Sequence, residues 1–211
     1  MEEKEYITLE KLGASEYEDR KSVFLGFAKP VTADTEAVEF INKIKAEYPD
    51  ARHHVYAYVL RENSGGRYTD DREPSGSAGL PVLDILRHGR IVDACIVVVR
   101  YFGGTLLGTG GLVKAYSTAA AEAVKAAGVI ARRPCIQFSL RLSYGDYQKV
   151  NAVFTRTGAK EENTEFGADV TVLGSIAAEG MAELQVALRD MSAGRAQLQE
   201  TGIGFFSVPL E

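Results

Sequence analysis

The segment best suited to ligand binding is a glycine-rich run, GGTLLGTGG at residues 103–111, which follows an apolar stretch and precedes an alanine-rich one. Between a strand and a helix, such a run exposes backbone N–H groups and a helix N-terminus to an anion. Arg100 before the run and Lys114 after it favour phosphate binding. The alternative is that the glycines only permit positive φ and tight strand–helix packing. Because the run lacks the phosphate-loop lysine and the G-x-G-x-x-G spacing, it does not indicate a nucleoside triphosphatase or a dinucleotide enzyme.

A second group of candidates, Arg52, His53 and His54, opens the alternating segment HHVYAYVL. Side chains alternate across a strand, so the two histidines face opposite sides and only one of them can share a face with Arg52. A cation and an imidazole on one face can form part of an anion site. The alternative is a half-buried histidine that is hydrogen-bonded at the entrance of the strand.

Acidic residues gather in a polar stretch at Asp70, Asp71 and Glu73, with Arg72 between them. Carboxylates at this spacing can bind a divalent cation or act in acid–base chemistry. We favour a supporting role, in which Asp71 or Ser75 caps the following helix and the acids orient the basic groups described above.

Neither a nucleophile nor a metal site is indicated. No Ser or Cys lies in a recognisable activating context, and three histidines without a cysteine pair give zinc little support. Cys95 and Cys135 lie in apolar runs, which is typical of buried hydrophobic residues rather than of a disulfide. We therefore predict no catalytic residue, cofactor or metal. Whether the protein is an enzyme stays open, with the balance against it.

Four aromatic residues, Tyr56, Tyr58, Tyr101 and Phe102, lie on or beside the same predicted strands. Exposed rings of this kind stack on the bases of single-stranded RNA. The alternative is core packing, which Tyr56 and Tyr58 favour because they share one strand face.

Hydrophobic periodicity predicts the elements that position these residues. In the first part of the chain we expect strands at 6–10, 21–31, 53–60 and 93–102, and helices at 35–48, 80–89 and 112–128, the first helix being capped by Asp34 or Thr35. The polar stretch 61–79 is predicted to be irregular, and a loop of this length in a compact domain is usually functional or mobile.

The pattern restarts after ARRP at residues 131–134. Strands are predicted at 135–142, 159–166, 168–177 and 195–210, and helices at 144–158 and 181–192. This order is βαββαβ, in which four strands form an antiparallel sheet under two helices. We therefore predict two domains, 1–130 and 135–211, with the junction near 129–134.

The net charge of −5 argues against nonspecific coating of nucleic acid, which relies on dense Lys and Arg. Residues 51–100, however, carry seven Lys/Arg, six Asp/Glu and all three histidines, which leaves room for a local basic surface. The charged N-terminus lacks the apolar stretch needed for export, and no segment approaches the roughly 20 apolar residues of a membrane span. We expect a cytoplasmic protein.

Four segments together resemble the IMPACT/YigZ family over residues 1–130: KSVF, PDARHHVYAYVL, DDREPSGSAGLPVLDIL and VVVRYFGGTLLGTGGLVKAYS. The most specific part is Arg100-Tyr101-Phe102-Gly103-Gly104 with Leu107-Gly108. The resemblance implies an α+β protein whose N-terminal domain is like domain IV of elongation factor G, a two-layer fold of ribosomal-protein type. It also implies a ferredoxin-like C-terminal domain, like domain V of the same factor.

The resemblance also carries functional expectations. Eukaryotic relatives regulate translation through an additional N-terminal domain, so their partner is not carried over to this chain. For bacterial members the family implies association with RNA or the ribosome. Four positions depart from the family pattern: Arg72 replaces a usual glycine, Val23 an arginine, Ser77 a threonine and Leu80 a lysine. Arg72 lacks the backbone freedom of glycine, which puts the shape of its loop in question.

Our leading hypothesis is a non-enzymatic, translation-associated factor that binds RNA or the ribosome through its N-terminal domain, with a protein partner in translation control as a further expectation. The predicted nucleic-acid or anion contacts are Arg52, His54, Arg100, Tyr101, Gly103, Gly104, Gly108 and Lys114, supported by His53, Asp70, Asp71 and Glu73. Two alternatives stay open. One is a small-molecule or nucleotide-handling enzyme that uses the same residues in a cleft, and the other is a protein-interaction module.

Overall fold

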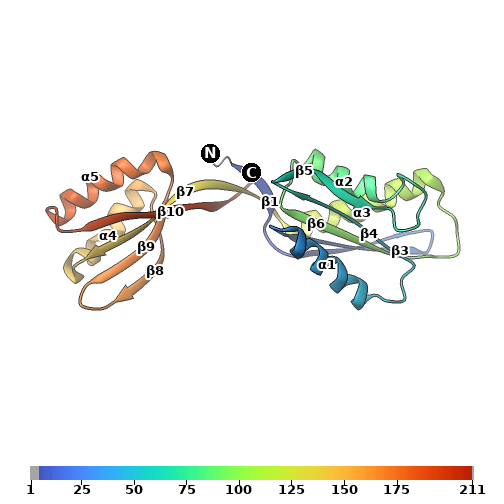
Figure 1. The fold of residues 1–211 in the computed structure, drawn as a ribbon, viewed down its shortest axis with the longest axis horizontal. Coiled ribbons are helices and arrows are strands. Elements are labelled where there is room, and N and C mark those ends of the chain that lie inside the picture. The colour runs from blue at the N-terminus through green and yellow to red at the C-terminus, as the bar shows by residue number, and fades with distance from the viewer. Residues whose placement is uncertain (1–4, 211) are drawn as a thin grey trace. The chain divides into compact units, whose positions relative to one another are not determined.

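The computed structural model describes residues 5–210, which form two compact units (Figure 1). The N-terminal unit spans Tyr6–Ala131 and the C-terminal unit spans Arg132–Val208. Helices and strands are mixed in both units, which confirms the predicted α+β class. None of the described helices is long and apolar enough to cross a membrane.

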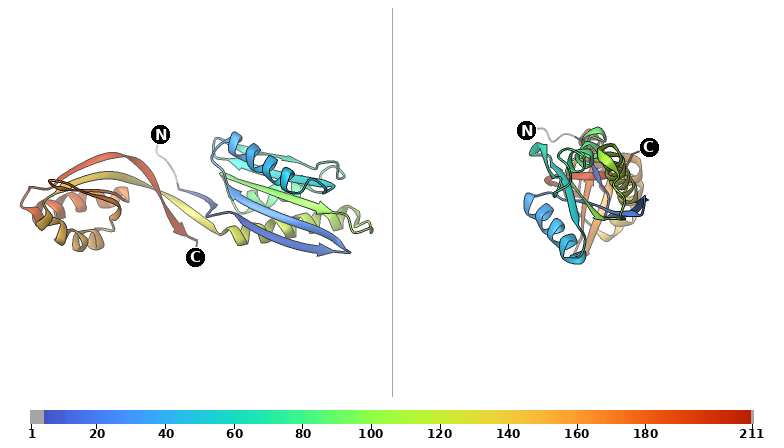
Figure 2. Two further views of the ribbon diagram at one scale, coloured as in Figure 1. Left: turned by 90° about the horizontal axis from the view of Figure 1, so that it is seen from below. Right: turned by 90° about the vertical axis from the view of Figure 1, so that its right-hand side faces the viewer.

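The N-terminal unit is built on one antiparallel sheet of five strands in the order β2-β3-β6-β4-β5. Its elements are β1 (Tyr6–Leu9), β2 (Gly13–Asp19), β3 (Ser22–Pro30), α1 (Asp34–Glu47), β4 (His53–Leu60), β5 (Asn63–Thr69), α2 (Gly79–His88), β6 (Ala94–Tyr101) and α3 (Gly108–Ala127). Helices α2 and α3 cover one face of the sheet, and α1 covers the other (Figure 2). The central strand β6 is therefore apolar along most of its length, because both of its faces are buried. Helices thus lie on both faces of the sheet, whereas the two-layer fold implied by the resemblance has helices on one face only.

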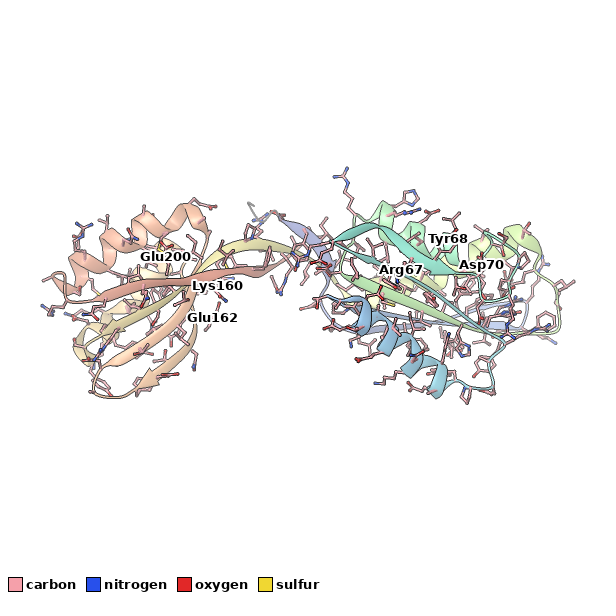
Figure 3. The ribbon with its side chains drawn as sticks, viewed as in Figure 1. Arg67, Tyr68, Asp70, Lys160, Glu162 and Glu200 are labelled. Atoms are coloured by element: carbon pink, nitrogen blue, oxygen red, sulfur yellow. The ribbon has the colours of Figure 1, made fainter. Side chains whose placement is uncertain are left out.

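Periodicity misses the two edge strands of this sheet, β2 and β5. The latter lies inside the stretch predicted to be irregular, pairs only with β4, and contains Gly66 at a φ of +70° (Figure 3 labels its Arg67 and Tyr68). Its sequence NSGGRYT is polar or glycine except for Tyr68, and none of residues 65–69 is buried, so it lacks the apolar–polar alternation that marks a half-buried strand. The irregular part of the predicted loop is therefore shorter and begins at Asp70.

The predicted cap of α1 is also wrong. The helix begins after Ala33, whose side chain makes no capping hydrogen bond, and neither Asp34 nor Thr35 occupies the cap position. Instead, the Glu36 carboxylate in the first turn accepts hydrogen bonds from the amide of Thr32 at 2.7 Å and from its hydroxyl at 3.1 Å. A carboxylate near the helix N-terminus also interacts favourably with the helix dipole.

The C-terminal unit confirms the predicted βαββαβ order. Its elements are β7 (Val129–Leu142), α4 (Tyr144–Thr157), β8 (Lys160–Phe166), β9 (Val170–Ile176), the short helix η1 (Ala178–Gly180), α5 (Met181–Ser192) and β10 (Gln197–Pro209). The strands lie in the order β10-β7-β9-β8, with α4 and α5 packed on one face, which is the ferredoxin-like arrangement. The first strand begins at Val129 rather than at Cys135. Pro134 is tolerated in it because the ladder with β9 starts only at Ile136.

Candidate functional site

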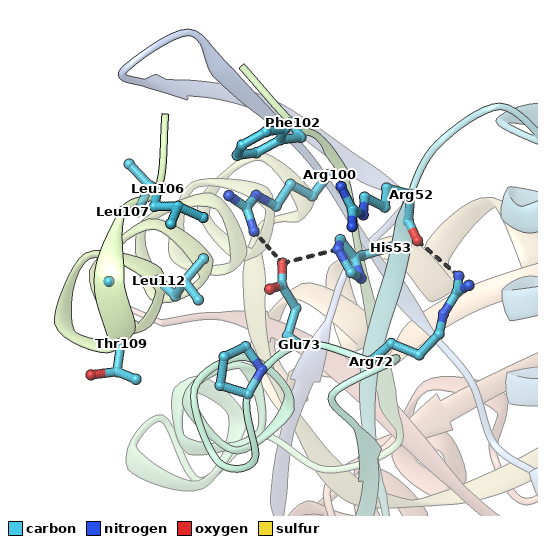
Figure 4. A pocket seen from close by; sticks show the side chains of 12 residues that line it. Arg52, His53, Arg72, Glu73, Arg100, Phe102, Leu106, Leu107, Thr109 and Leu112 are labelled. Atoms are coloured by element: carbon cyan, nitrogen blue, oxygen red, sulfur yellow. Dashed lines mark hydrogen bonds and ion pairs between the residues drawn. The ribbon is translucent and has the colours of Figure 1, made fainter. Parts of the chain in front are cut away.

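A pocket of 330 Å³ lies in the N-terminal unit, at the start of β4, the end of β6 and the first turn of α3. The loop between β5 and α2 closes one side of it (Figure 4). It is lined by Arg52, His53, Arg72, Glu73, Pro74, Arg100, Phe102, Leu106, Leu107, Gly108, Thr109 and Leu112. Most of these residues belong to, or directly adjoin, the groups of candidates around Arg52, around Glu73 and in the glycine-rich run 103–111.

Strand pairing decides which histidine enters the pocket. His53 on β4 lies directly opposite Arg100 on β6, and Arg100 lies opposite Phe24 on β3. These three side chains face the layer of α2 and α3, and the guanidinium carbon of Arg100 is 5.4 Å from the centroid of the Phe24 ring. His54 faces the other way, and its Nε2 lies 2.9 Å from the carbonyl oxygen of Tyr48, to which it donates.

The Glu73 carboxylate is the acidic centre of the pocket, with only 4% of its side chain exposed. Its Oε1 accepts hydrogen bonds from Arg100 Nη1 at 2.5 Å and from the Tyr116 hydroxyl at 2.8 Å. Burial, with the negative charge of Glu73 as a second cause, raises the pKa of Tyr116 above its ordinary value, so the phenol keeps its proton and donates. Arg100 Nε is buried without a hydrogen-bond partner among the described residues. Glu73 therefore uses only part of the donor capacity of this guanidinium group.

The imidazole of His53 is held in one orientation by the loop. Its Nδ1 lies 2.8 Å from the carbonyl oxygen of Asp71, and a carbonyl only accepts, so Nδ1 carries a proton and donates it. Its Nε2 lies 3.7 Å from Glu73 Oε1. In the neutral ring Nε2 is consequently a proton acceptor at the wall of the pocket, and in the protonated ring it forms an ion pair with Glu73.

The loop itself is fixed by its two aspartates. The Asp70 carboxylate accepts from the amides of Gly76 (2.9 Å), Ala78 (3.1 Å) and Gly79 (2.8 Å), so it fills the role of cap for α2 that we predicted for Asp71 or Ser75 (Figure 3). Asp71 instead binds the amide of His54 through Oδ2 at 2.6 Å. One aspartate thus anchors the loop to the helix and the other anchors it to β4.

Two arginines at the rim of the pocket, Arg52 and Arg72, are exposed. Arg72 donates from Nη2 to the carbonyl oxygen of Arg52 at 2.8 Å, and 75% of its side chain is exposed. The guanidinium carbon of Arg52 is 5.8 Å from the centroid of the Phe102 ring, which is itself 40% exposed. Guanidinium groups over an aromatic face gain cation–π attraction, so Phe102 positions the Arg52 charge at the opening.

The glycines of the run serve different purposes. A Cβ on Gly103 would lie 2.0 Å from the backbone carbonyl carbon of Lys21, so this position requires glycine for close packing. Gly104 and Gly108 adopt φ values of +88° and +71°, which favour glycine, whereas Gly110 has open space around it. Gly108 is also the first residue of α3 and lines the pocket. Close packing therefore accounts for Gly103, and anion binding by the run stays a prediction.

The structure brings together only some of the predicted contacts. Arg52, Arg100 and Gly108 line the pocket, as do His53 and Glu73 from the supporting group. His54 does not, for the reason given above, and Tyr101 turns away and donates its hydroxyl to Asp50. Outside the lining are Lys114, which lies on α3, and Gly103 and Gly104, which lie between β6 and α3. Asp70 and Asp71 hold the loop behind the pocket.

Several lining residues escaped the sequence prediction. Arg72 contributes a rim charge, and Leu106, Leu107 and Leu112 form an apolar wall opposite it (Figure 4). The sequence did contain a signal for Leu106, because an apolar side chain inside a glycine-rich run has no neighbouring core position to fill. In the structure this side chain is 82% exposed. Tyr116 lay too far along the sequence from Glu73 to be linked with it.

Within residues 5–210 no group of three or more His, Cys, Asp and Glu side chains is arranged to hold a metal ion. Cys95 and Cys135 are both free and buried. The pocket walls offer three guanidinium groups, one carboxylate and one imidazole. This combination can bind an anion, and it can accept a proton at His53 Nε2.

Comparison with known proteins gives the family. Residues 20–124, which include every lining residue, match the Impact N-terminal domain, and residues 140–195 match a domain of unknown function, DUF1949. The IMPACT family member YigZ of Escherichia coli is 34% identical over 184 residues, which cover 86% of this chain and 90% of that protein. This chain belongs to the IMPACT family.

Other IMPACT relatives agree with this assignment. The family member YvyE of Bacillus subtilis is 43% identical over 129 residues, which cover 61% of this chain and 59% of that protein. A solved structure titled as that of a hypothetical protein has a TM-score of 0.60 and 30% identity, and covers 95% of this chain and 98% of that one. Protein IMPACT of Xenopus laevis matches at 30% identity over 94 residues. The IMPACT resemblance predicted from the sequence is confirmed.

Proposed function

We propose that this IMPACT protein is a translation-associated factor that binds RNA, free or on the ribosome, through the pocket of its N-terminal unit. The observation that carries the proposal is the set of three arginines, Arg52, Arg72 and Arg100, around a concave site that contains a single carboxylate, Glu73. The translation context comes from the family resemblance. The pocket adds a physical basis for binding the RNA backbone.

Charge balance supports an anionic ligand. Glu73 neutralises Arg100 at 2.5 Å, and no second carboxylate among the described residues lines the pocket to neutralise Arg52 and Arg72 at the rim. Arg72 does lie 3.7 Å from Asp71, but 75% of the Arg72 side chain is exposed, and an ion pair with an exposed partner is screened by solvent and worth little. Guanidinium groups bind phosphate oxygens in pairs of parallel hydrogen bonds, so two of them at one opening favour a phosphate.

An exposed ring beside the charges supports nucleic acid over a simple anion. Phe102 lies between the arginines and the apolar wall, and Arg100 as well as Arg52 approaches its ring (Figure 4). Stacking on one aromatic side chain contributes about 1–3 kcal/mol per base and needs no particular sequence. We therefore expect RNA binding with a weak sequence preference.

The test compares the Arg52→Ala/Arg72→Ala double variant with wild type for binding to single-stranded RNA, measured by fluorescence anisotropy across a range of salt. Both side chains are exposed, so their removal leaves the core intact. We expect at least a tenfold loss of affinity at low salt. The slope of log K against log salt should fall by about 1.4, because each lost phosphate contact contributes about 0.7.

A matched control removes two exposed cations of the same unit that do not line the pocket, in the variant Arg90→Ala/Lys125→Ala. It should bind RNA as wild type does. Equal binding by the pocket variant, the control and wild type, or no RNA binding by any of them, would rule the proposal out. Co-sedimentation of wild type and the pocket variant with ribosomes extends the same comparison to the ribosome.

One observation favours a second candidate, a nucleotide-handling enzyme. His53 is fixed through Nδ1, and its Nε2 faces both Glu73 and the pocket, which is the geometry of a general base or acid. Mass spectrometry of RNA and nucleotides incubated with the protein tests it. Products formed by wild type and lost in His53→Gln, with RNA affinity unchanged in that variant, would favour the enzyme over the binding factor.

A further inference from the structure

The pocket has a charged end and an apolar end. Arg52 and Arg72 lie on one side, Leu106, Leu107 and Leu112 lie on the other, and the buried Glu73 lies between them (Figure 4). At 330 Å³, the cavity is at the lower end of the range of about 300–1,000 Å³ that encloses single small ligands. The size of the pocket therefore matches one nucleotide unit.

The charge of the pocket favours a dianion. Its three guanidinium groups and one carboxylate give a net charge of +2 with His53 neutral. An internal phosphodiester carries one negative charge, whereas a phosphomonoester carries about −1.5 to −2 at neutral pH and has an additional oxygen that accepts hydrogen bonds. The stronger match is therefore with a terminal phosphate.

The pocket contains further donors and positive potential besides the two rim arginines. Only 6% of the Arg100 side chain is exposed, yet its Nε has no hydrogen-bond partner among the described residues. The first turn of α3 also lines the pocket at Gly108 and Thr109, and its first backbone N–H groups have no intrahelical acceptor. The helix terminus adds positive potential to a site already built from buried and exposed arginines.

We propose that the ligand of this pocket is a nucleoside phosphomonoester, present either at the terminus of an RNA chain or in a free mononucleotide. The phosphate lies against Arg52 and Arg72, and the base lies against Phe102 and the leucine wall. This inference rests on the proposed RNA-binding function and deepens it, because it states which part of an RNA the pocket recognises.

The experiment uses the full chain and one short unstructured RNA in four forms: with a 5′-phosphate, with a 3′-phosphate, with hydroxyls at both ends, and covalently circular. We expect at least one phosphorylated form to bind tenfold or more tightly than the hydroxyl-ended and circular forms. The Arg52→Ala variant should weaken binding of the phosphorylated RNA at least fivefold more than binding of the hydroxyl-ended RNA, and so lose most of this preference. The Lys114→Ala variant, which removes an exposed cation of α3 outside the lining, should retain it.

Competition separates the two sources of the ligand. If a nucleoside monophosphate displaces the phosphorylated RNA when the two are present at equal concentration, the pocket takes the free nucleotide. If it competes only weakly, the pocket takes the RNA end. Both outcomes support the phosphomonoester.

Equal affinity for all four RNA forms overturns this inference while leaving the proposed function intact. Inorganic phosphate that competes as well as the nucleotide also overturns it, because the aromatic and apolar wall would then contribute nothing. Absence of binding to every form instead removes the proposed function itself. Thermal unfolding of each variant checks that the comparison is made on folded protein.

Discussion

At the scale of single residues, the loop behind the pocket carries backbone strain. Arg72 adopts a φ of +71° and Asp71 a φ of +39°, in a region that costs an L-residue roughly 1–2 kcal/mol. Arg72 stands where the family resemblance has glycine. The hydrogen bond from its side chain to the Arg52 carbonyl oxygen offsets part of this cost and places a positive charge at the pocket.

We predict that Arg72→Gly is more stable than Arg72→Ala by about 1 kcal/mol, because both lose the side chain and only glycine relieves the strain. Urea unfolding of the two variants measures the difference. Both should weaken RNA binding to a similar extent, since both remove the rim charge. Equal stability of the two variants would show that the positive φ stores no strain.

Among the residues that line the pocket, we single out the buried Glu73 as one whose loss should strongly destabilise the fold. Removing one partner of a buried ion pair leaves the other charge uncompensated and costs about 3–5 kcal/mol. We expect Glu73→Ala to reduce the free energy of unfolding by this amount, because it orphans Arg100 and the Tyr116 hydroxyl together. Chemical denaturation provides the measurement. Glu122→Ala, at an exposed position of α3, is the matched control and should change stability by less than about 0.5 kcal/mol.

At the scale of elements, helix N-termini are stabilised in distinct ways. Helix α2 uses Asp70 from eight residues before its cap position, whereas α4 uses Ser143 at the cap itself, which accepts from the amide of Asp146 at 3.2 Å. The Ser143 hydroxyl in turn donates to Asp146 Oδ2 at 2.9 Å, and this bond holds the pKa of Asp146 below its ordinary value. Burial opposes the shift, and the Arg195 charge assists it.

This pKa shift predicts how α4 responds to acid. Because the folded-state pKa of Asp146 is lowered, its carboxylate stabilises the fold above its unfolded pKa of about 3.9, and this contribution is lost as pH falls through the lower folded value. The stability difference between wild type and Asp146→Asn should therefore be largest near neutral pH and shrink below about pH 4. Thermal unfolding at several pH values measures it. A difference that stays constant or grows in acid would contradict the assignment.

At the scale of the whole molecule, each unit has its own hydrophobic core. Phe138, Val172 and Leu184 belong to the core of the C-terminal unit, and Phe24, Leu83 and Tyr116 belong to that of the N-terminal unit. Because these cores are built from separate residues, we expect core substitutions in one unit to leave the fold of the other largely unchanged.

Phe138→Ala tests this separation. Phe138 is 1% exposed and packs edge-to-face against Phe154, so its loss should cost the C-terminal unit about 3–5 kcal/mol. Calorimetry should show a lower unfolding temperature for that unit only, and RNA affinity below that temperature should match wild type. Phe166→Ala, at a position 63% exposed, should shift the transition far less. A loss of RNA affinity in Phe138→Ala alone would show that the units act together.

The sequence by itself determined the α+β class, the βαββαβ order of the second unit and the family. The class and the order depend on local periodicity, since apolar residues at spacing 2 or 3.6 define strands and helices wherever they pack. The family depends on residue types in short segments, such as RYFGG at 100–104. The sequence also placed Arg52, Arg100 and Gly108 in one candidate site. It missed the edge strands β2 and β5, whose sequences GASEYED and NSGGRYT contain few apolar residues.

Only the tertiary structure decided how the site is assembled. The register of β4 against β6 sets His53 opposite Arg100 and turns His54 away, and a shift of one residue would exchange the two histidines. The backbone of the loop after β5 decides that Glu73 meets Arg100 while Asp70 caps α2. These contacts join residues far apart in the chain, so their geometry depends on strand pairing and loop conformation, which residue types and local spacing do not specify.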